Sequence, residues 1–340
     1  MNATAQLHSV HTGHQAVRSQ QAAVVSAPMR TQIETTRVLE PQTGEVRVRL
    51  EGCGVCASNL AVWEGRSWFE YPREPGSPGH EGWGVVDAVG EEVTDLEVGT
   101  RVAMISGHAY AQFDIAARDA IVPLPRELDD RVFPGEPLGC VMNIFERAQI
   151  EPHHRVAVVG AGFLGLLLAQ LASRSGASVV VLSRRPYALD VARSMGAAEV
   201  FETENAWAAR ERALAASDGR GYDRVIEAVG HQEALDLASA LAAEYGRLVI
   251  AGYHQDGPRQ VDMQQWNWRA LDVINAHERA TARYVEGVRR AVSAVLSGRI
   301  DPFPLLTHEL AMSQLDEAFE LTRSRPDGFI KAVLRTEMQG

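Results

Sequence analysis

The chain is 340 residues long, 46% of them hydrophobic, and carries a formal net charge of -11. Because single hydrophobic cores stop growing near about 250 to 300 residues, this length predicts two domains. The negative charge argues against nucleic acid or an anionic membrane as partner. The sequence also contains no apolar run of about 18 residues, the length needed to span a bilayer. The polar first 20 residues lack the apolar block of a signal peptide, and the N-terminal 15 or so are the candidate for disorder. We expect a cytoplasmic protein that acts on a small molecule.

Short alternating or β-branched runs fill residues 22–122, among them EVRVRL, WGVVDAV and TRVAMI. This pattern, broken by Gly and Pro clusters, predicts a β-rich half. Within it, the segment 71–84, YPREPGSPGHEGWG, is too dense in proline and glycine for regular structure. We expect a loop there that positions site residues.

The pattern then changes, because RVAVVG predicts a strand, FLGLLLAQLASRSG an apolar helix and SVVVLS a second strand. Strand, helix and strand in about 30 residues form a βαβ unit. The alternation continues through EVFE, DRVIEAVG, the helix QEALDLASALAAEYG and RLVIAGY, which predicts a doubly wound parallel sheet at residues 151–276. Helices near 283–297 and 313–322 and the last strand, FIKAVLR, are expected to return to the first domain.

Gly160, Gly162 and Gly165 form GAGFLG between a predicted strand and a predicted helix. A tight turn and bare backbone at this point let a pyrophosphate reach the helix N-terminus. The alternative is that the glycines only form a strand-to-helix turn, but their position between a predicted strand and a predicted helix favours cofactor binding. We therefore predict a nicotinamide dinucleotide site whose binding residues are Gly160, Gly162, Phe163, Leu164 and Gly165.

The end of the second strand of this unit reads Ser183, Arg184 and Arg185. An acidic residue at this position accepts the ribose hydroxyls of NAD(H), whereas a small residue followed by arginine suits a phosphate. A guanidinium forks onto a phosphate with charge-assisted hydrogen bonds. The sequence favours NADP(H) over NAD(H), the alternative being two solvated arginines at the start of a helix.

Cys56 lies in GCGVCAS at the predicted end of a strand, and His80 with Glu81 lies in the Pro/Gly loop. Thiolate, imidazole and carboxylate are zinc ligands. Taken singly, the cysteine is typical of a buried small hydrophobe and the histidine of a loop residue bonded to backbone. Three cysteines, an odd and sparse set, do not form a disulfide framework.

The segments GCGVCASNL, PGHEGWGVV, EPLGC, VAVVGAGFLG and FIKAVL, in this order, resemble the zinc-containing medium-chain dehydrogenase family of alcohol and polyol dehydrogenases. The resemblance covers nearly the whole chain. It implies an α/β protein with a GroES-like β-rich catalytic domain, residues 1–150 with 277–340, and a Rossmann domain, residues 151–276. It also implies a zinc-dependent oxidoreductase that transfers a hydride between a nicotinamide cofactor and an alcohol or carbonyl, with EPL favouring a polyol, sugar or cyclitol.

The resemblance implies that Cys56, His80 and Glu81 lie at the catalytic zinc. For the remaining ligand EPLGC offers both Glu136 and Cys140, and the EPL start favours Glu136. The four-cysteine lobe that holds a second zinc in many relatives is absent, so we expect one zinc per subunit.

Two other positions follow from the resemblance. Ser58 corresponds to the hydroxyl that transfers a proton to or from the reacting oxygen, and Lys331 to a basic residue that approaches the cofactor pyrophosphate. Two positions depart from the family: Asn59, where relatives commonly have Asp bonded to the zinc histidine, and Ala61, where many have a proton-releasing histidine. The amide predicts weaker tuning of the zinc histidine.

Two alternatives use the same nucleotide fold. A zinc-free enone or quinone reductase would lack the Cys, His and Glu set, and a non-enzymatic nucleotide-binding module would not need it. We expect a homo-oligomer, dimer or tetramer.

Overall fold

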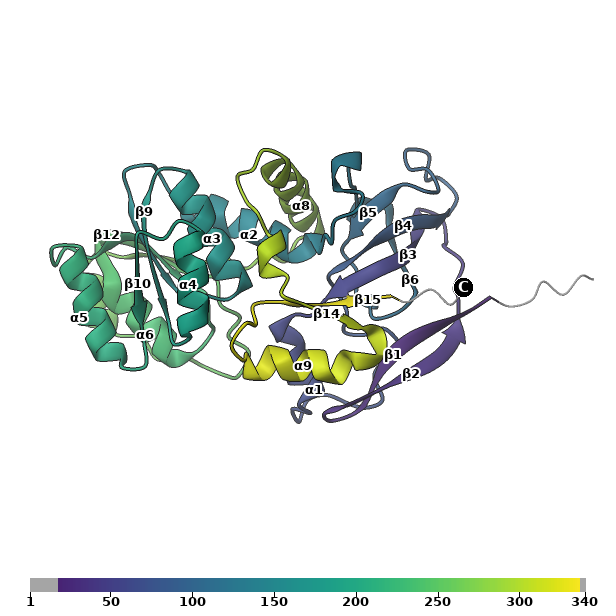
Figure 1. The fold of residues 1–340 in the computed structure, drawn as a ribbon, viewed down its shortest axis with the longest axis horizontal. Helices are drawn as coiled ribbons and strands as arrows, with labels where there is room; N and C mark the ends of the chain where they lie inside the picture. The colour runs from purple at the N-terminus through teal and green to yellow at the C-terminus, as the bar shows by residue number, and fades with distance from the viewer. Residues whose placement is uncertain (1–17, 337–340) are drawn as a thin grey trace, which may run out of the picture.

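The computed structural model describes residues 18–336, which form a β-hairpin and two larger sheets (Figure 1). The prediction of disorder for the N-terminal 15 or so residues lies outside the described residues. None of the helices within 18–336 is long and apolar enough to cross a membrane.

A mixed sheet holds the predicted β-rich half. Its strands run in the order β14-β15-β3-β4-β5-β7, with β6 also paired to β3, and only β14 and β15 are parallel to each other. The C-terminal segment therefore returns to this sheet, as predicted. The strands are β3 (Glu45–Gly54), β4 (Gly82–Val89), β5 (Arg101–Met104), β6 (Phe113–Ala117), β7 (Ile121–Pro123), β14 (His308–Ala311) and β15 (Ala332–Arg335).

The second sheet is parallel throughout, in the order β10-β9-β8-β11-β12-β13. Numbered along the chain this is 3-2-1-4-5-6, the order of the doubly wound dinucleotide-binding fold. It confirms the predicted alternation. The elements are β8 (Arg155–Val159), α3 (Phe163–Arg174), β9 (Ser178–Ser183), α4 (Pro186–Ser194), β10 (Glu199–Glu202), α5 (Ala206–Ala216), β11 (Tyr222–Glu227), α6 (Gln232–Leu241), β12 (Ala242–Ile250), α7 (Met263–Trp268) and β13 (Asp272–Asn275).

Helices α2 (Gly135–Ala148) and α8 (Thr281–Leu296) pack against each other where the two sheets meet (Figure 1). One hydrophobic cluster runs from Ala103 on β5 through Val141 on α2 to Leu166 on α3. The two sheets are thus joined by a shared core, and the site elements at their meeting point are held by packing.

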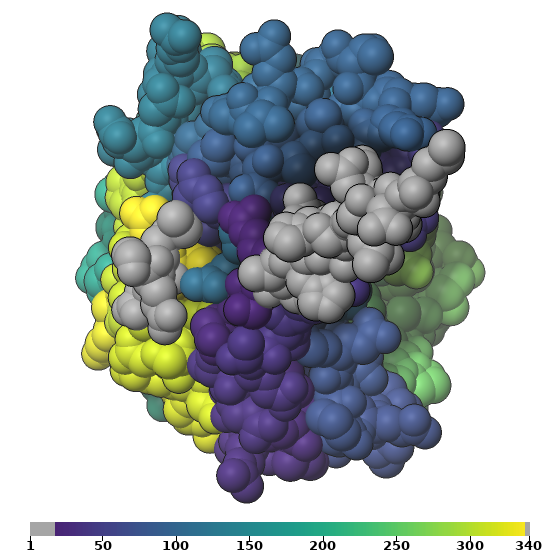
Figure 2. Space-filling view, turned by 90° about the vertical axis from the view of Figure 1, so that its right-hand side faces the viewer, coloured from purple at the N-terminus to yellow at the C-terminus, as the bar shows by residue number. Residues whose placement is uncertain are grey.

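The hairpin of β1 (Ser19–Ala27) and β2 (Arg30–Arg37) lies beside α9 (Leu315–Ser324), and Figure 2 shows the purple hairpin next to the yellow C-terminal segment. Asp316 on α9 accepts from Thr31 N at 3.0 Å and from Trp63 Nε1 at 2.8 Å. Trp63 ends the short helix α1 (Leu60–Trp63) and stacks on Phe319, with ring centroids 5.5 Å apart. These contacts fix α1, which follows the segment of Cys56.

One predicted helix is too long. The segment QEALDLASALAAEYG was expected to be helical to Gly246, but α6 ends at Leu241 and β12 begins at Ala242. Ala242 pairs with Tyr222 on β11, so strand pairing outweighs the helix propensity of the Ala-Ala-Glu run.

Candidate metal and dinucleotide site

The end of β3 lies beside the beginnings of β4 and β15. Cys53 on β3 pairs with Gly82 on β4 and with Leu334 on β15. Because both partners are antiparallel to β3, the segment that follows β3 meets the segments that precede β4 and β15. These segments carry the predicted site residues Cys56, His80, Glu81 and Lys331.

The ligand atoms of Cys56, His80 and Glu81 all lie within 4.8 Å of one another. His80 Nδ1 is 3.0 Å from Pro78 O, and because a carbonyl oxygen only accepts, Nδ1 carries the proton there. In the neutral ring that binds a metal, the lone pair of Nε2 is then the one available to the ion. The structure brings together the three residue types that the sequence singled out.

The electrostatics of this cluster fit a bound cation. Burial by itself lowers the pKa of His80, but the hydrogen bond and negative charge of Cys56, together with the charges of Glu136 and Glu81, raise that pKa to about 10. An excess of anionic donors around a buried imidazole is the environment that a divalent cation neutralises. Thiolate, imidazole and carboxylate also match the ligand preference of zinc.

Lys331 is paired with Glu81 in the interior. Its Nζ donates to Glu81 Oε1 at 2.7 Å and to Val55 O at 3.0 Å, and the Glu81 side chain is fully buried. Nζ also lies 5.4 Å from the ring centroid of Phe163, in the glycine loop. Lys331 therefore stands between the candidate metal cluster and the dinucleotide loop, and its contact with a pyrophosphate stays a prediction.

Gly54 is required by this pair. A Cβ at that position would lie 1.8 Å from Glu81 Oε2, closer than atoms can approach. The glycine leaves the space that the buried carboxylate occupies.

Glu136 and Cys140 lie one turn apart at the start of α2. The Cys140 thiol donates to Glu136 Oε1 at 3.2 Å. Burial raises the pKa of both groups, and the charge of Glu136 raises that of Cys140 further. A neutral thiol next to a carboxylate favours Glu136 as the metal ligand, although this assignment stays a prediction.

Asn59 and Tyr110 form a polar contact behind the cluster that the sequence did not indicate. Asn59 Nδ2 donates to Pro78 O at 3.1 Å and to Tyr110 OH at 2.9 Å. The partner of His80 is therefore the Pro78 carbonyl rather than residue 59. An ionised aspartate at position 59 could not donate to Pro78 O, whereas the Asn59 amide does. This hydrogen bond accounts for an amide at this position.

Ser58 lies beside the candidate metal thiolate, with its Oγ 3.2 Å from Cys56 Sγ and 3.3 Å from Asn59 Oδ1. The side chain is half-buried. The hydroxyl is therefore held at the edge of the cluster by two acceptors.

The glycine loop follows β8, the strand at which the order of the parallel sheet reverses. Gly160 has φ 111°, which side chains rarely adopt, and a Cβ on Gly165 would lie 1.9 Å from Gly160 O. At Gly162, the N-cap of α3, a Cβ would meet only open space, and no side chain caps the helix. The geometry leaves the first N–H groups of α3 available to a pyrophosphate.

The three residues at the end of β9 differ in their contacts. Ser183 is buried and its Oγ accepts from Arg185 N at 3.3 Å. The Arg185 guanidinium donates to Phe329 O at 2.6 Å and to Ala161 O at 3.0 Å. Arg184 is exposed and has no hydrogen bond or ion pair with another residue of 18–336. Arg184 is thus the guanidinium best placed to meet a ligand.

A second group of possible metal ligands, Glu151, His153 and His154, lies at the surface before β8. His154 Nδ1 accepts from Glu151 N at 2.9 Å. The neutral ring then carries its proton on Nε2 and has no second lone pair to offer. We therefore do not assign a metal to it.

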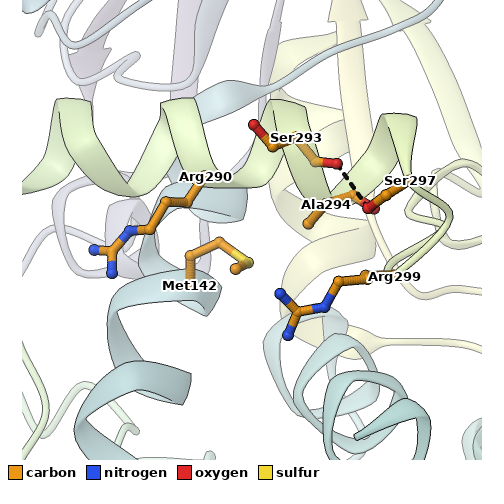
Figure 3. Close-up of a pocket in the computed structure, with 6 residues that line it drawn as sticks. All are labelled: Met142, Arg290, Ser293, Ala294, Ser297 and Arg299. Carbon is orange, nitrogen blue, oxygen red and sulfur yellow. Dashed lines mark hydrogen bonds between the residues drawn. The ribbon is translucent and has the colours of Figure 1, made fainter.

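A small surface cavity of about 160 Å³ lies between α2 and α8 (Figure 3). Ser297 Oγ donates to Ser293 O at 2.8 Å along its upper wall. None of the predicted site residues lines the cavity, whose lining is Met142, Arg290, Ser293, Ala294, Ser297 and Arg299.

Two family models match the chain. Residues 42–122 match the alcohol dehydrogenase GroES-like domain, and residues 164–293 match the zinc-binding dehydrogenase model. They fall on the mixed sheet and on the parallel sheet, respectively.

Curated relatives match over most of their own length. A sorbitol dehydrogenase of Halalkalibacterium halodurans is 25% identical over 84% of this chain and 91% of its own. A probable D-xylulose reductase A of Arthroderma otae is 28% identical over 81% of this chain and 86% of its own. Such relatives do not favour the zinc-free or non-enzymatic alternatives.

Solved structures share the fold. An rspB dehydrogenase of Escherichia coli complexed with NADH has a TM-score of 0.82 at 24% identity, covering 93% of this chain and 99% of its own. A putative zinc-binding dehydrogenase of Sinorhizobium meliloti bound to NADP has a TM-score of 0.79 at 22% identity, covering 94% and 99%. The chain belongs to the zinc-containing medium-chain alcohol dehydrogenase family, and it is an oxidoreductase that transfers a hydride between a nicotinamide cofactor and an alcohol or carbonyl group.

Proposed function

We propose that Cys56, His80, Glu81 and Glu136 hold one catalytic zinc, and that the enzyme interconverts a hydroxyl and a carbonyl of a polyol, sugar or cyclitol. The observation that carries this proposal is the convergence of thiolate, imidazole and carboxylate within 4.8 Å. The polyol class is supported by the EPL sequence at Glu136 and by the sorbitol dehydrogenases among the relatives.

The residues of the chain have distinct parts in this chemistry. Zinc, when bound, polarises a carbonyl or lowers the pKa of an alcohol, and nicotinamide carries the hydride. Ser58, at the edge of the cluster, is the group we assign to exchange the proton of the reacting oxygen. Ala61 carries no titratable group, so solvent or the cofactor ribose receives the proton after Ser58. Lys331 holds Glu81 in place through the buried ion pair.

We further propose that residues 151–276 form the dinucleotide-binding domain, with the remainder catalytic, and that NADP(H) is preferred. The preference is supported by the absence of a carboxylate among Ser183, Arg184 and Arg185 and by the exposed guanidinium of Arg184. The same loop accepts either cofactor through its glycines, so the phosphate contact decides between them.

We expect one zinc per subunit. The His154 lone pair is already engaged, and the sequence has no four-cysteine lobe for a second ion. Elemental analysis of the purified protein gives the number of zinc ions per subunit. Light scattering measures whether the protein is the predicted dimer or tetramer. Two tightly held zinc ions would overturn this expectation.

The Arg184→Gln variant should weaken NADPH binding. A lost charge-assisted contact is worth roughly 1.5 to 3 kcal/mol, which corresponds to about tenfold to a hundredfold in the dissociation constant. NADH, which lacks the 2′-phosphate of NADPH, should bind as before. Calorimetric titration measures both, and Arg193→Gln, whose arginine pairs with Asp190 on the exposed face of α4, is the control.

The Ser183→Asp variant should go further. It places a carboxylate against the phosphate and offers NADH a partner for its ribose hydroxyls, so the preference should invert. Tighter binding of NADH by the unaltered protein would refute the cofactor proposal and leave the dehydrogenase assignment intact.

A substrate screen tests the proposed class directly. Polyols, cyclitols, simple secondary alcohols and aldehydes are each incubated with either cofactor, and reduced nicotinamide is followed by absorbance. We expect the highest kcat/KM with a polyhydroxylated substrate. Turnover confined to monohydric alcohols would contradict the polyol proposal.

A further inference from the structure

A segment of the C-terminal region lies against the end of β9. Helix α9 ends at Ser324, and its C-cap residue Arg325 has a left-handed backbone with φ 50°. The chain then runs to Phe329, whose carbonyl accepts from the Arg185 guanidinium at 2.6 Å. In Figure 1 this is the end of α9 that points toward the parallel sheet. The turn at 325–329 is thereby held next to the dinucleotide loop.

This arrangement gathers three guanidinium groups, those of Arg184, Arg185 and Arg325. Burial and, to a smaller extent, the positive charge of Arg325 together lower the pKa of Arg185 to about 10. Loss of hydration lowers the pKa of Arg325, and the positive charge of Arg184 adds to that effect. The guanidinium groups of Arg184 and Arg325 therefore repel each other.

The partners of these groups differ. Arg185 is held by two carbonyls and also lies near the carboxylate of Asp327, which raises its pKa. Arg325 has one long hydrogen bond, Nε to Thr322 O at 3.3 Å, and Arg184 has none within the described residues. Two guanidinium groups that lie close together with N–H donors left unpaired are stabilised by an anion that binds between them.

We propose that Arg325 determines cofactor specificity, because its guanidinium and that of Arg184 together clamp the 2′-phosphate of NADP(H). The proposal rests on the proposed use of NADP(H) and adds a residue from outside the parallel-sheet domain. The end of β9 is where the adenosine ribose of a dinucleotide lies in this fold, so the phosphate falls between β9 and the turn after α9. Arg185, tied to both Phe329 and Ala161, is a positioning residue that fixes the turn.

The test compares Arg325→Gln with Arg323→Gln. Arg323 pairs with Glu320 at 2.8 Å on the same helix, so its loss controls for a charge removed from α9. Titration calorimetry measures dissociation constants for NADPH, NADH, adenosine 2′,5′-bisphosphate and AMP. We expect Arg325→Gln to raise the constants for NADPH and the bisphosphate about tenfold and to leave those for NADH and AMP within about twofold. Arg325→Lys, which keeps the charge but not the fork, should give a smaller loss.

The outcomes separate this proposal from the one on which it rests. If the unaltered protein does not prefer NADPH over NADH, the proposed cofactor and the clamp both fail. If the unaltered protein prefers NADPH and Arg184→Gln weakens it, but Arg325→Gln binds both cofactors as before, the clamp alone is wrong. Equal weakening of NADPH and NADH in Arg325→Gln, with an unchanged thermal midpoint, also overturns it, because NADH has no 2′-phosphate for Arg325 to contact.

Discussion

Replacement of Cys56 by alanine is expected to remove the zinc and to lower kcat about a thousandfold or more. A bound metal contributes several kcal/mol to stabilising the developing charge, and each 1.4 kcal/mol or so is a factor of about ten in rate. Cofactor binding should persist, because the glycine loop lies between β8 and α3 in the parallel sheet, whereas Cys56 follows β3 of the mixed sheet. Elemental analysis, steady-state kinetics and calorimetric titration with NADPH measure the three quantities.

Cys53→Ala is the matched control. Cys53 lies three residues upstream and is buried in the hydrophobic core of the mixed sheet, and its thiol donates to Gly54 O at 3.3 Å. It should keep both zinc and turnover. A Cys56→Ala protein with full activity would contradict the proposed metal site. Loss of zinc from Glu136→Ala but not from Cys140→Ala would identify the remaining ligand.

The parallel sheet was the part of the fold most open to prediction from the sequence. Its signals are local, because RVAVVG and SVVVLS are uninterrupted apolar runs and the glycine turn marks where the helix starts. The boundary of α6 and β12 was not predictable, since Ala242 to Gly246 has the composition of a helix and becomes a strand only by pairing with β11. Helix propensity is a weak preference that such tertiary pairing overrides.

The candidate site divides in the same way. Cys56, His80 and Glu81 carry chemically distinctive side chains in short motifs, so residue type alone indicated them. The partner of Lys331 is Glu81, 250 residues away in the chain, and the pairing of both β4 and β15 with β3 brings them together. The Pro78 carbonyl is a backbone atom without a sequence signature, and the approach of Arg325 to Arg184 depends on how α9 packs.

The buried pair of Glu81 and Lys331 leads to the second large expected effect. Lys331→Met keeps the length of the side chain and removes its charge, which leaves the fully buried Glu81 carboxylate without its cationic partner. Removing one member of a buried pair costs about 3 to 5 kcal/mol. We expect the free energy of unfolding of the metal-free protein to fall by about that amount, measured by urea denaturation followed by circular dichroism.

The Glu81→Gln substitution made in the same background tests whether charge is the cause. In the double variant no uncompensated carboxylate remains, so much of the lost stability should return, and the two single substitutions should be strongly non-additive. Arg335→Met is the matched control, because Arg335 ends β15, the strand that begins just after Lys331, and forms an exposed pair with Glu309 at 2.8 Å, which should be worth less than about 1 kcal/mol. Zinc should reduce the effect of Lys331→Met, since a bound cation beside Glu81 supplies the missing positive charge. A Lys331→Met protein as stable as the unaltered one, with or without zinc, would show that the buried ion pair does not stabilise the fold.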